Sequence, residues 1–281
     1  MNRLGILAGQ GPLPRLVAEH ERAAGRDPFM VAFKGETDPG TVDGLPHVWV
    51  DLASVGRTIR ELKQAECHRL CLIGPIGRPD FTRLRPDLRG MKLLPRILAA
   101  ARRGGDDAML SVVVQDLEAE GFAVVGADEL VAALRPSEGV LGRHAPDDTA
   151  LSDIERGRAV LDALSPFDVG QACVVRQGQV LALEAAEGTA GMLARCRDFR
   201  DEMAGADRQG VLVKLPKRGQ DRRVDLPMLG PDTVLQARDA GLAGIALEAG
   251  GVLMLDQQQV RQAADDCGLF LLGLAARETD S

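Results

Sequence analysis

The chain has 281 residues, which is more than one typical domain holds, so two domains are expected. Hydrophobic residues make up 45% of it and charged residues 27%, as in soluble globular proteins, and no apolar run approaches the roughly 20 residues that span a bilayer. The formal net charge of −7 disfavours nucleic-acid binding through a generally basic surface.

Charge is distributed unevenly along the chain. Residues 1–135 hold 18 basic and 18 acidic side chains, whereas residues 136–281 hold 16 basic and 23 acidic ones. One segment, residues 78–103, is locally basic, with eight bases and only two acids. Two interpretations stay open: the segment is a solvated loop and helix face, or it is a patch that meets the phosphates of a substrate or a membrane.

The five cysteines and four histidines lack the spacing of a metal site, and no C-x-x-C pair occurs. We therefore expect reduced thiols in the core and a cytoplasmic location, because the start of the chain lacks the features of a signal peptide. Carboxylates are then the expected ligands of any metal, and they suit Mg²⁺, with Mn²⁺ as the alternative.

The first part of the chain alternates apolar strands with helices. Strands are predicted at 4–9, 29–33, 47–50, 69–76 and 122–126. Helices are predicted at 14–25, 53–66, 91–104 and 106–121. This order predicts an α/β fold whose N-terminal domain, residues 1–135, is Rossmann-like with a doubly wound parallel sheet.

The pattern changes after residues 135–149, which are rich in Pro, Gly and polar side chains and are the predicted connection. Residues 136–281 are predicted to form a C-terminal mixed α/β domain that carries the catalytic groups. Two β-hairpins are expected, around residues 177–178 and around residues 250–251. A helix at 189–203, a strand at 210–215 and a helix at 232–241 are predicted between them.

The stretch "GILAGQGPLP" places Gly9, Gln10 and Gly11 between the first strand and the first helix. Backbone N–H groups and a helix N-terminus at one place favour phosphate, and Lys34 after the second strand suits an anion. Pro14 stands where a dinucleotide fingerprint needs its third glycine. Phosphate contact, a tight structural turn and dinucleotide redox binding therefore stay open.

Two further groups could serve a site or simply cap a helix. Asp107 lies in "GGDDAML", at the predicted start of a helix, where an acid suits the helix dipole. Gln171 begins one strand of the first hairpin, and Glu184 and Glu187 close it ahead of Gly188 and Thr189 at the start of a helix. A carboxylate, a hydroxyl and backbone N–H groups meet in that turn, although capping by Thr189 explains it equally well.

The stretch "KLPKRGQDRRVDLPMLGP", residues 214–231, is unusually charged for a connecting loop. Asp221 and Asp225 can hold a divalent cation or activate a water molecule, and Arg222 and Arg223 can neutralise phosphate oxygens. Cleavage of a phosphoanhydride needs this combination. The alternative is a surface ion-pair network of little energetic consequence.

Taken together, these motifs resemble the LpxI family, the UDP-2,3-diacylglucosamine pyrophosphatases of lipid A biosynthesis in Gram-negative bacteria. The resemblance also includes "DVGQACVV", "EAAEGTAGMLAR" and "GLAGIALEAGGVLMLD", and it spans nearly the whole chain. Its most specific element, Gln-Asp-x-Arg-x-Asp-x-Pro, corresponds here to Gln220, Asp221, Arg223, Asp225 and Pro227.

The resemblance implies Mg²⁺-dependent hydrolysis of the pyrophosphate of an acylated nucleotide sugar, giving UMP and 2,3-diacylglucosamine 1-phosphate (lipid X). Asp225 and Asp221 would be metal ligands or water-activating carboxylates, and Lys214 and Arg223 would stabilise charge on the pyrophosphate. The implied substrate-binding residues are Gly9, Gln10, Gly11, Lys34, Asp107, Gln171, Glu187, Gly188, Thr189, Gln220 and Arg222. A non-catalytic protein that binds such a ligand is the alternative. Peripheral contact with the cytoplasmic face of the inner membrane and homodimer formation stay open.

Overall fold

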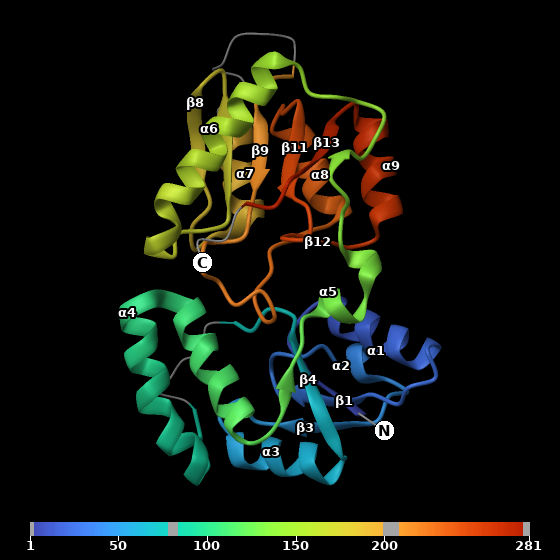
Figure 1. Cartoon of the computed structure of the whole chain (residues 1–281), viewed down its shortest axis with the longest axis vertical. Helices are drawn as coiled ribbons and strands as arrows, with labels where there is room; N and C mark the ends of the chain where they lie inside the picture. Colours follow the sequence, from blue (N-terminus) through green and yellow to red (C-terminus); the bar gives the residue numbers. More distant parts are fainter. Residues whose placement is uncertain (1–2, 78–83, 199–207, 278–281) are drawn as a thin grey trace. The chain divides into compact units, whose positions relative to one another are not determined.

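A computed structural model of the chain describes residues 3–77, 84–198 and 208–277 (Figure 1). The chain divides into two compact units. Unit 1 comprises residues 1–131 and the five residues 221–225, and unit 2 comprises residues 132–220 and 226–281.

Unit 1 is built on a five-stranded sheet in which every pairing is parallel, in the order β3-β2-β1-β4-β5. Its strands are β1 (Arg3–Ala8), β2 (Phe29–Phe33), β3 (His47–Val50), β4 (Cys67–Ile73) and β5 (Ala123–Val124). The predicted Rossmann-like parallel sheet is thus confirmed. The strand order reverses between β1 and β4, and ligands of such sheets bind outside the carboxyl ends of the strands at this point.

The helices of unit 1 are α1 (Leu13–Ala23), α2 (Pro39–Val42), α3 (Val55–Gln64), α4 (Leu88–Ala119) and α5 (Ala127–Leu130). Helix α3 buries Ile59 and Leu62, which lie three residues apart and therefore on one face of the helix. They pack in one core cluster with Val31 of β2 and with Val114 and Leu117 of α4.

Helix α4 is two helical segments joined by a bend, as Figure 1 shows. Gly104 and Gly105 have non-helical backbone angles, and the φ of Gly105 is +69°. Arg89 near the start of the helix bonds Asp116 at 3.0 Å and Glu120 at 2.6 Å, so the first segment folds back along the second. The two helices predicted at 91–104 and 106–121 correspond to these segments.

Unit 2 contains a mixed six-stranded sheet in the order β6-β13-β11-β9-β7-β8. Its strands are β6 (Gly139–Val140), β7 (Ala172–Arg176), β8 (Gln179–Leu183), β9 (Val211–Lys214), β11 (Gly244–Glu248) and β13 (Phe270–Leu274). Strands β9, β11 and β13 are mutually parallel, and β7 runs antiparallel to β9. The predicted mixed α/β character of the second half is confirmed.

Of the two predicted hairpins, the first is confirmed and the second is wrong. Strands β7 and β8 pair antiparallel around residues 177–178. The residues around 250–251 do form a turn, but β11 before it pairs in parallel with β9 and β13. The strand after it, β12 (Leu253–Met254), pairs with β10 (Met228–Leu229). Both edges of β11 are already occupied, so the following segment must find another partner.

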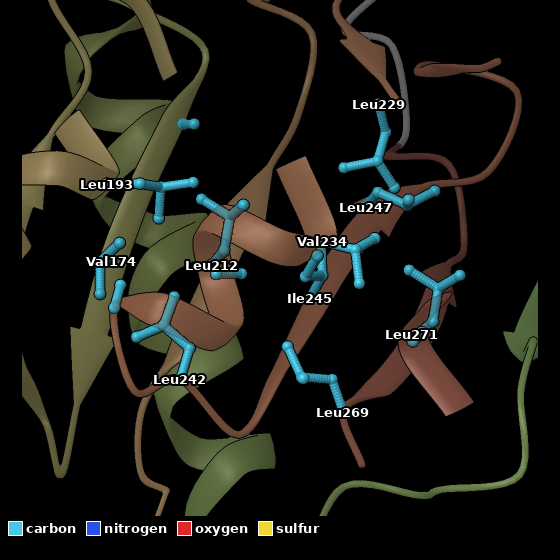
Figure 2. Close-up of a cluster of buried hydrophobic side chains, with 14 of the residues drawn as sticks. Val174, Leu193, Leu212, Leu229, Val234, Leu242, Ile245, Leu247, Leu269 and Leu271 are labelled. Atoms are coloured by element: carbon cyan, nitrogen blue, oxygen red, sulfur yellow. The ribbon is translucent and has the colours of Figure 1, made fainter. Parts of the chain in front are cut away.

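Helices cover both faces of the unit 2 sheet. They are α6 (Asp148–Leu164), α7 (Gly188–Asp198), α8 (Pro231–Asp239) and α9 (Gln257–Cys267), with 3₁₀ turns at Ala132–Leu134 and Ser165–Phe167. Residues 199–203 of the helix predicted at 189–203 lie outside the described residues. Leu212 packs in one core cluster with Leu193 of α7 and Val234 of α8 (Figure 2). Its neighbour Val213 packs in a different cluster with Ile154 of α6. This alternation places the two side chains on opposite faces of β9.

All five cysteines are buried and unbridged, as expected for core thiols. Burial raises the pKa of Cys71 and of Cys173 to about 12. Neither thiol is therefore a reactive thiolate near neutral pH.

The first testable prediction concerns Gly9, directly after β1. A Cβ at this residue would lie 2.2 Å from the backbone oxygen of Gly74. We expect Gly9→Ala to lower the free energy of unfolding by about 1–3 kcal/mol, because backbone must move to admit the methyl group. Gly40→Ala is the matched control, since a Cβ at Gly40 meets nothing within 4 Å. Denaturant unfolding curves measure both, and equal midpoints for the two variants would refute this account.

Candidate functional site

The turn after β1 lies at the point where the strand order of unit 1 reverses. Gly9 N donates to Ile73 O at 2.8 Å, and Gln10 N donates to Pro75 O at 2.8 Å. Two of the backbone N–H groups expected to face a phosphate therefore bond to the end of β4 and to the chain just after it. The close approach of the two chain segments, rather than an anion, explains the requirement for Gly9.

Acidic side chains surround this turn in addition to the predicted lysine. Gln10 Nε2 donates to Glu36 Oε2 at 3.1 Å, and the same oxygen accepts from Gly77 N at 2.8 Å. Lys34 is exposed and forms an ion pair with Asp51 at 3.3 Å. The turn thus has carboxylates beside it, so it is suited to neutral polar groups of a ligand at least as well as to phosphate.

Five residues of the charged loop between β9 and β10 belong to unit 1, although both strands belong to unit 2. Segment 221–225 groups with unit 1, and Val224 packs against the core cluster of that unit. Arg223 is bound inside unit 1 by two carboxylates. Its Nη1 donates to Glu118 Oε1 at 2.6 Å, and its Nε and Nη2 donate to the two oxygens of Asp221 at 2.9 and 2.7 Å.

Both oxygens of Asp221 are thus engaged by one guanidinium, and the backbone N–H of Arg223 adds a third donor at 3.1 Å. These hydrogen bonds with Arg223 hold the pKa of Asp221 below its usual value, although partial burial opposes them. The backbone N–H groups of Val224 and Asp225 both point to Asp221 O, at 3.2 and 3.3 Å. The segment is therefore a compact turn in which Arg222 and Asp225 are half-buried.

In unit 2, polar side chains gather where the parallel strands end. Lys214 is the last residue of β9, and it pairs with Ala172 at the start of the antiparallel β7. Lys214 Nζ donates to Thr189 Oγ1 at 2.7 Å, and Thr189 Oγ1 donates to Glu184 Oε1 at 2.5 Å. The other oxygen of Glu184 accepts from Gln171 N at 2.8 Å. We call Lys214, Thr189, Glu184 and Gln171 the Lys214 chain.

Lys214 is only 6% exposed, which is unusual for a lysine. Burial lowers the pKa of Lys214, and the negative charge of Glu184 opposes that shift. A buried ammonium group exerts a stronger field on a neighbouring anion than one in water. It also releases its proton more readily, so the group can serve charge stabilisation or proton transfer.

Two of the predicted residues beside the Lys214 chain have other contacts. Glu187 forms an ion pair with Arg195, whose guanidinium also donates to Leu183 O at 2.9 Å. Gly188 has a φ of +72° and begins α7, which places Thr189 in the first turn of that helix. Glu184, three residues before Glu187, occupies the role in the hydrogen-bond chain for which the sequence favoured Glu187.

Further ion pairs fix the start of the charged loop to unit 2. Lys217 forms an ion pair with Asp168, and its backbone N–H donates to Gln220 Oε1 at 3.0 Å. Arg277 is 8% exposed and donates to Glu248 at 2.7 Å, to Asp162 and to the backbone oxygen of Pro216.

The structure therefore brings the predicted site residues together in two groups, one in each unit. Unit 2 joins Lys214, Thr189 and Gln171, with Gln220 on the same loop, and unit 1 joins Asp221, Arg222, Arg223 and Asp225. Asp107 is half-buried on the second segment of α4.

Three charged side chains that take part in these contacts were not expected from the sequence: Asp168, Glu248 and Arg277. Glu184 was expected to close the first hairpin with Glu187, but its bond to Thr189 was not predicted. Asp168 and Arg277 lie in loops and Glu248 is the last residue of β11, and the sequence does not show the neighbours of these three residues in space.

Among the described residues, no three or more His, Cys, Asp or Glu side chains form a group that could hold a metal ion. Mg²⁺ is commonly held by one or two carboxylates together with substrate phosphates and water. Asp225 and Asp221 both have the donor chemistry for that mode, and both oxygens of Asp221 accept hydrogen bonds from Arg223. Within the described part of the chain, no helix is long and apolar enough to cross a membrane.

The second prediction concerns the pH dependence of stability from Asp221. Since its folded pKa lies below the unfolded value of about 4, its stabilising contribution is complete above the unfolded pKa and is lost as pH falls through the folded pKa. We expect Asp221→Asn to cost about 1–3 kcal/mol at pH 7 and progressively less in acid.

Urea unfolding of wild type and variant between neutral and acidic pH measures this difference. Asp27→Asn is the control, because Asp27 is 70% exposed in its pair with Arg3 and should contribute little. A cost for Asp221→Asn that does not change with pH would contradict the prediction.

Comparison with known proteins identifies the family. The LpxI N-terminal domain family matches residues 3–134, and the LpxI C-terminal domain family matches residues 137–272. The UDP-2,3-diacylglucosamine pyrophosphatase LpxI of Caulobacter vibrioides is 42% identical over 280 residues, which cover 99% of both chains.

Solved structures show only a weak likeness to this chain. CobK precorrin-6A reductase covers 100% of this chain and 90% of its own, at 14% identity and a TM-score of 0.32. An isoflavone reductase covers 99% and 79%, at 12% identity and a TM-score of 0.30. These values are too low to support a shared fold. The family matches and the full-length relative, by contrast, agree along the whole sequence, and the chain belongs to the LpxI family.

Proposed function

We propose that this protein hydrolyses the pyrophosphate bond of UDP-2,3-diacylglucosamine, giving UMP and 2,3-diacylglucosamine 1-phosphate. The observation that carries the proposal is the full-length relative at 42% identity, whose name states a pyrophosphatase acting on that substrate. Both family domains match in the same order, so the proposal concerns the whole chain.

The Lys214 chain supplies a positive charge suited to a pyrophosphate. An ammonium group has three N–H donors, and Lys214 gives one of them to Thr189. The other donors can reach phosphate oxygens, whose negative charge grows when the bridging P–O bond breaks. Thr189 and Glu184 hold the ammonium group at a fixed position, which reduces the reorganisation needed during reaction.

Asp225 is the carboxylate that we propose to activate the attacking water or to hold a metal ion. Asp221 is its near neighbour, but the paired hydrogen bonds with Arg223 give Asp221 a positioning role in this proposal. The guanidinium of Arg223 donates to the carboxylates of Asp221 and Glu118, so in this structure it is directed to protein groups. Gln220 and Arg222 flank Asp221 and remain proposed substrate contacts.

Mg²⁺ is the proposed cofactor, and Mn²⁺ would suit the same carboxylate and phosphate oxygens. When bound, the ion would neutralise charge on the pyrophosphate oxygens. Asp225 would orient the water molecule and accept its proton, and Lys214 would balance the charge of the departing phosphate.

The third prediction tests the assignment of the two aspartates. With UDP-2,3-diacylglucosamine and Mg²⁺, we expect Asp225→Asn to lower kcat/KM for UMP release by about 10²–10⁴-fold, because a positioned base contributes on that scale. Asp221→Asn should lower it much less, by about tenfold, because it changes only the position of the turn. UMP is measured by chromatography.

Three results would overturn these assignments. Wild-type protein that releases no UMP would refute the reaction. Saturable binding of the substrate without turnover would favour the non-catalytic alternative. If Asp225→Asn keeps the wild-type kcat/KM while Asp221→Asn loses most of it, the roles assigned to the two carboxylates must be exchanged.

The fourth prediction tests the Lys214 chain. Thr189→Val keeps the shape of the side chain but removes the hydroxyl between Lys214 and Glu184, so kcat should fall by about tenfold or more with little change in KM. Thr189→Ser retains the hydroxyl and is the matched control, expected to stay within about threefold of wild type. Equal activities of the Val and Ser variants in the same UMP assay would refute a role for the hydrogen bond.

A further inference from the structure

The first segment of α4 carries a face that the rest of unit 1 does not cover. Residues 88–103 contain five bases and no acid. An α-helix turns by about 100° per residue, and on this basis the exposed side chains of residues 88–103 fall within one arc of about 140° around the helix axis. We call this arc the α4 face; its apolar and basic members are Leu88, Met91, Lys92, Arg96, Arg102 and Arg103.

Two large apolar side chains of the α4 face are open to solvent. Leu88 is 77% exposed and Met91 is 51% exposed. The opposite side of the helix fixes its orientation, since Leu93 is 4% exposed and a Cβ at Gly90 would lie 2.3 Å from Ala53 O.

The N-terminus of the helix is anchored as firmly as its inner side. Asp87 accepts from Gly90 N at 2.8 Å and from Arg57 N at 3.0 Å. Arg89 bonds Asp116 and Glu120 on the second segment, as described above. These contacts hold Leu88 and Met91 outward, so their exposure is built into the fold.

The cations of the α4 face are not neutralised by close ion pairs with neighbouring acids. Lys92, Arg102 and Arg103 form no ion pair with any carboxylate of the described residues, and Arg96 approaches Asp116 only at 3.9 Å. A solvent-open pocket of about 410 Å³ lies at this face, lined by Leu88, Arg89, Lys92, Leu93, Arg96 and Asp116. Its lining combines two leucines with three cations and Asp116, which is paired with Arg89, so that basic and apolar groups suited to a lipid headgroup lie together.

We propose that the α4 face docks on a bilayer that contains anionic phospholipids. Leu88 and Met91 would enter the boundary between headgroups and acyl chains, while the four cations meet lipid phosphates. The proposal concerns a surface and not the reaction, so it does not depend on the proposed function. A diacylated substrate would nevertheless be encountered at such a surface.

Two other occupants fit the face less well. Nucleic acid would complement the four cations but would leave Leu88 and Met91 without an apolar partner. A second copy of the chain joined through this same face by two-fold symmetry would set its cations against one another. Only an anionic bilayer matches both the charge and the exposed aliphatic side chains.

Flotation of the full-length protein with vesicles tests the proposal. We expect wild type to float with vesicles of phosphatidylethanolamine and phosphatidylglycerol and to stay behind with phosphatidylcholine alone. The triple variant Lys92→Gln, Arg102→Gln, Arg103→Gln should bind anionic vesicles about 100-fold more weakly, at about fivefold for each cation. The double variant Leu88→Ser, Met91→Ser should bind about tenfold more weakly, and its remaining binding should disappear at high salt.

A second triple variant controls for net charge. Arg22→Gln, Arg60→Gln, Arg156→Gln removes the same number of exposed cations from other helices and should bind within about twofold of wild type. Circular dichroism and thermal unfolding show that each variant is folded.

Several outcomes would overturn the proposal. Failure of wild type to float with anionic vesicles would refute it, and an equal loss of binding by both triple variants would assign the effect to bulk charge. Binding of duplex nucleic acid without vesicle binding, or burial of the α4 face in a homodimer detected by sedimentation, would assign the face to another partner. None of these measurements requires substrate turnover, so they stand apart from the UMP assay.

Discussion

The paired hydrogen bonds between Arg223 and Asp221 shape the loop on which the candidate site depends. The loop begins in unit 2 at Lys214, contributes residues 221–225 to unit 1 and returns to unit 2 at Leu226. Glu118 holds the remaining side of Arg223, and Val224 packs into the core of unit 1. A segment that crosses between two units needs such local anchors, because the flanking strand and helix cannot determine its conformation.

The charges of this loop therefore have two different uses. Lys217 is neutralised by Asp168, and Asp221 and Arg223 neutralise one another, so these side chains fix the backbone. Lys214 differs because it is buried, has a lowered pKa and donates to a hydroxyl rather than to a carboxylate. This contrast favours Lys214 as the chemically active cation of the proposed reaction, with the ion pairs of the loop as its structural support.

Much of the fold could be predicted from the sequence because its signals are local. Apolar runs alternating with amphipathic helices predicted every strand of the parallel sheet in unit 1. The first hairpin followed from Gln177 and Gly178, whose positive φ angles suit a tight turn between two apolar runs. The same reasoning failed at Gly250 and Gly251, because strand partners are chosen by the whole sheet. Helices α6 and α9 and strand β13 were not predicted, and neither was the role of Glu184.

The sequence by itself determined the residue types of the site and the family pattern that orders them: the loop of acids and bases, Thr189 after a glycine, and Gln171 at the start of a strand. Only the tertiary structure decided which of these side chains contact one another and which are engaged in ion pairs with neighbouring groups. Hydrogen bonds and burial depend on groups that are distant along the chain, as Glu184 is from Lys214 and Glu118 is from Arg223. A sequence pattern shows that a charge is present, but only the packed chain sets the partner and the solvent exposure that give the charge its chemistry.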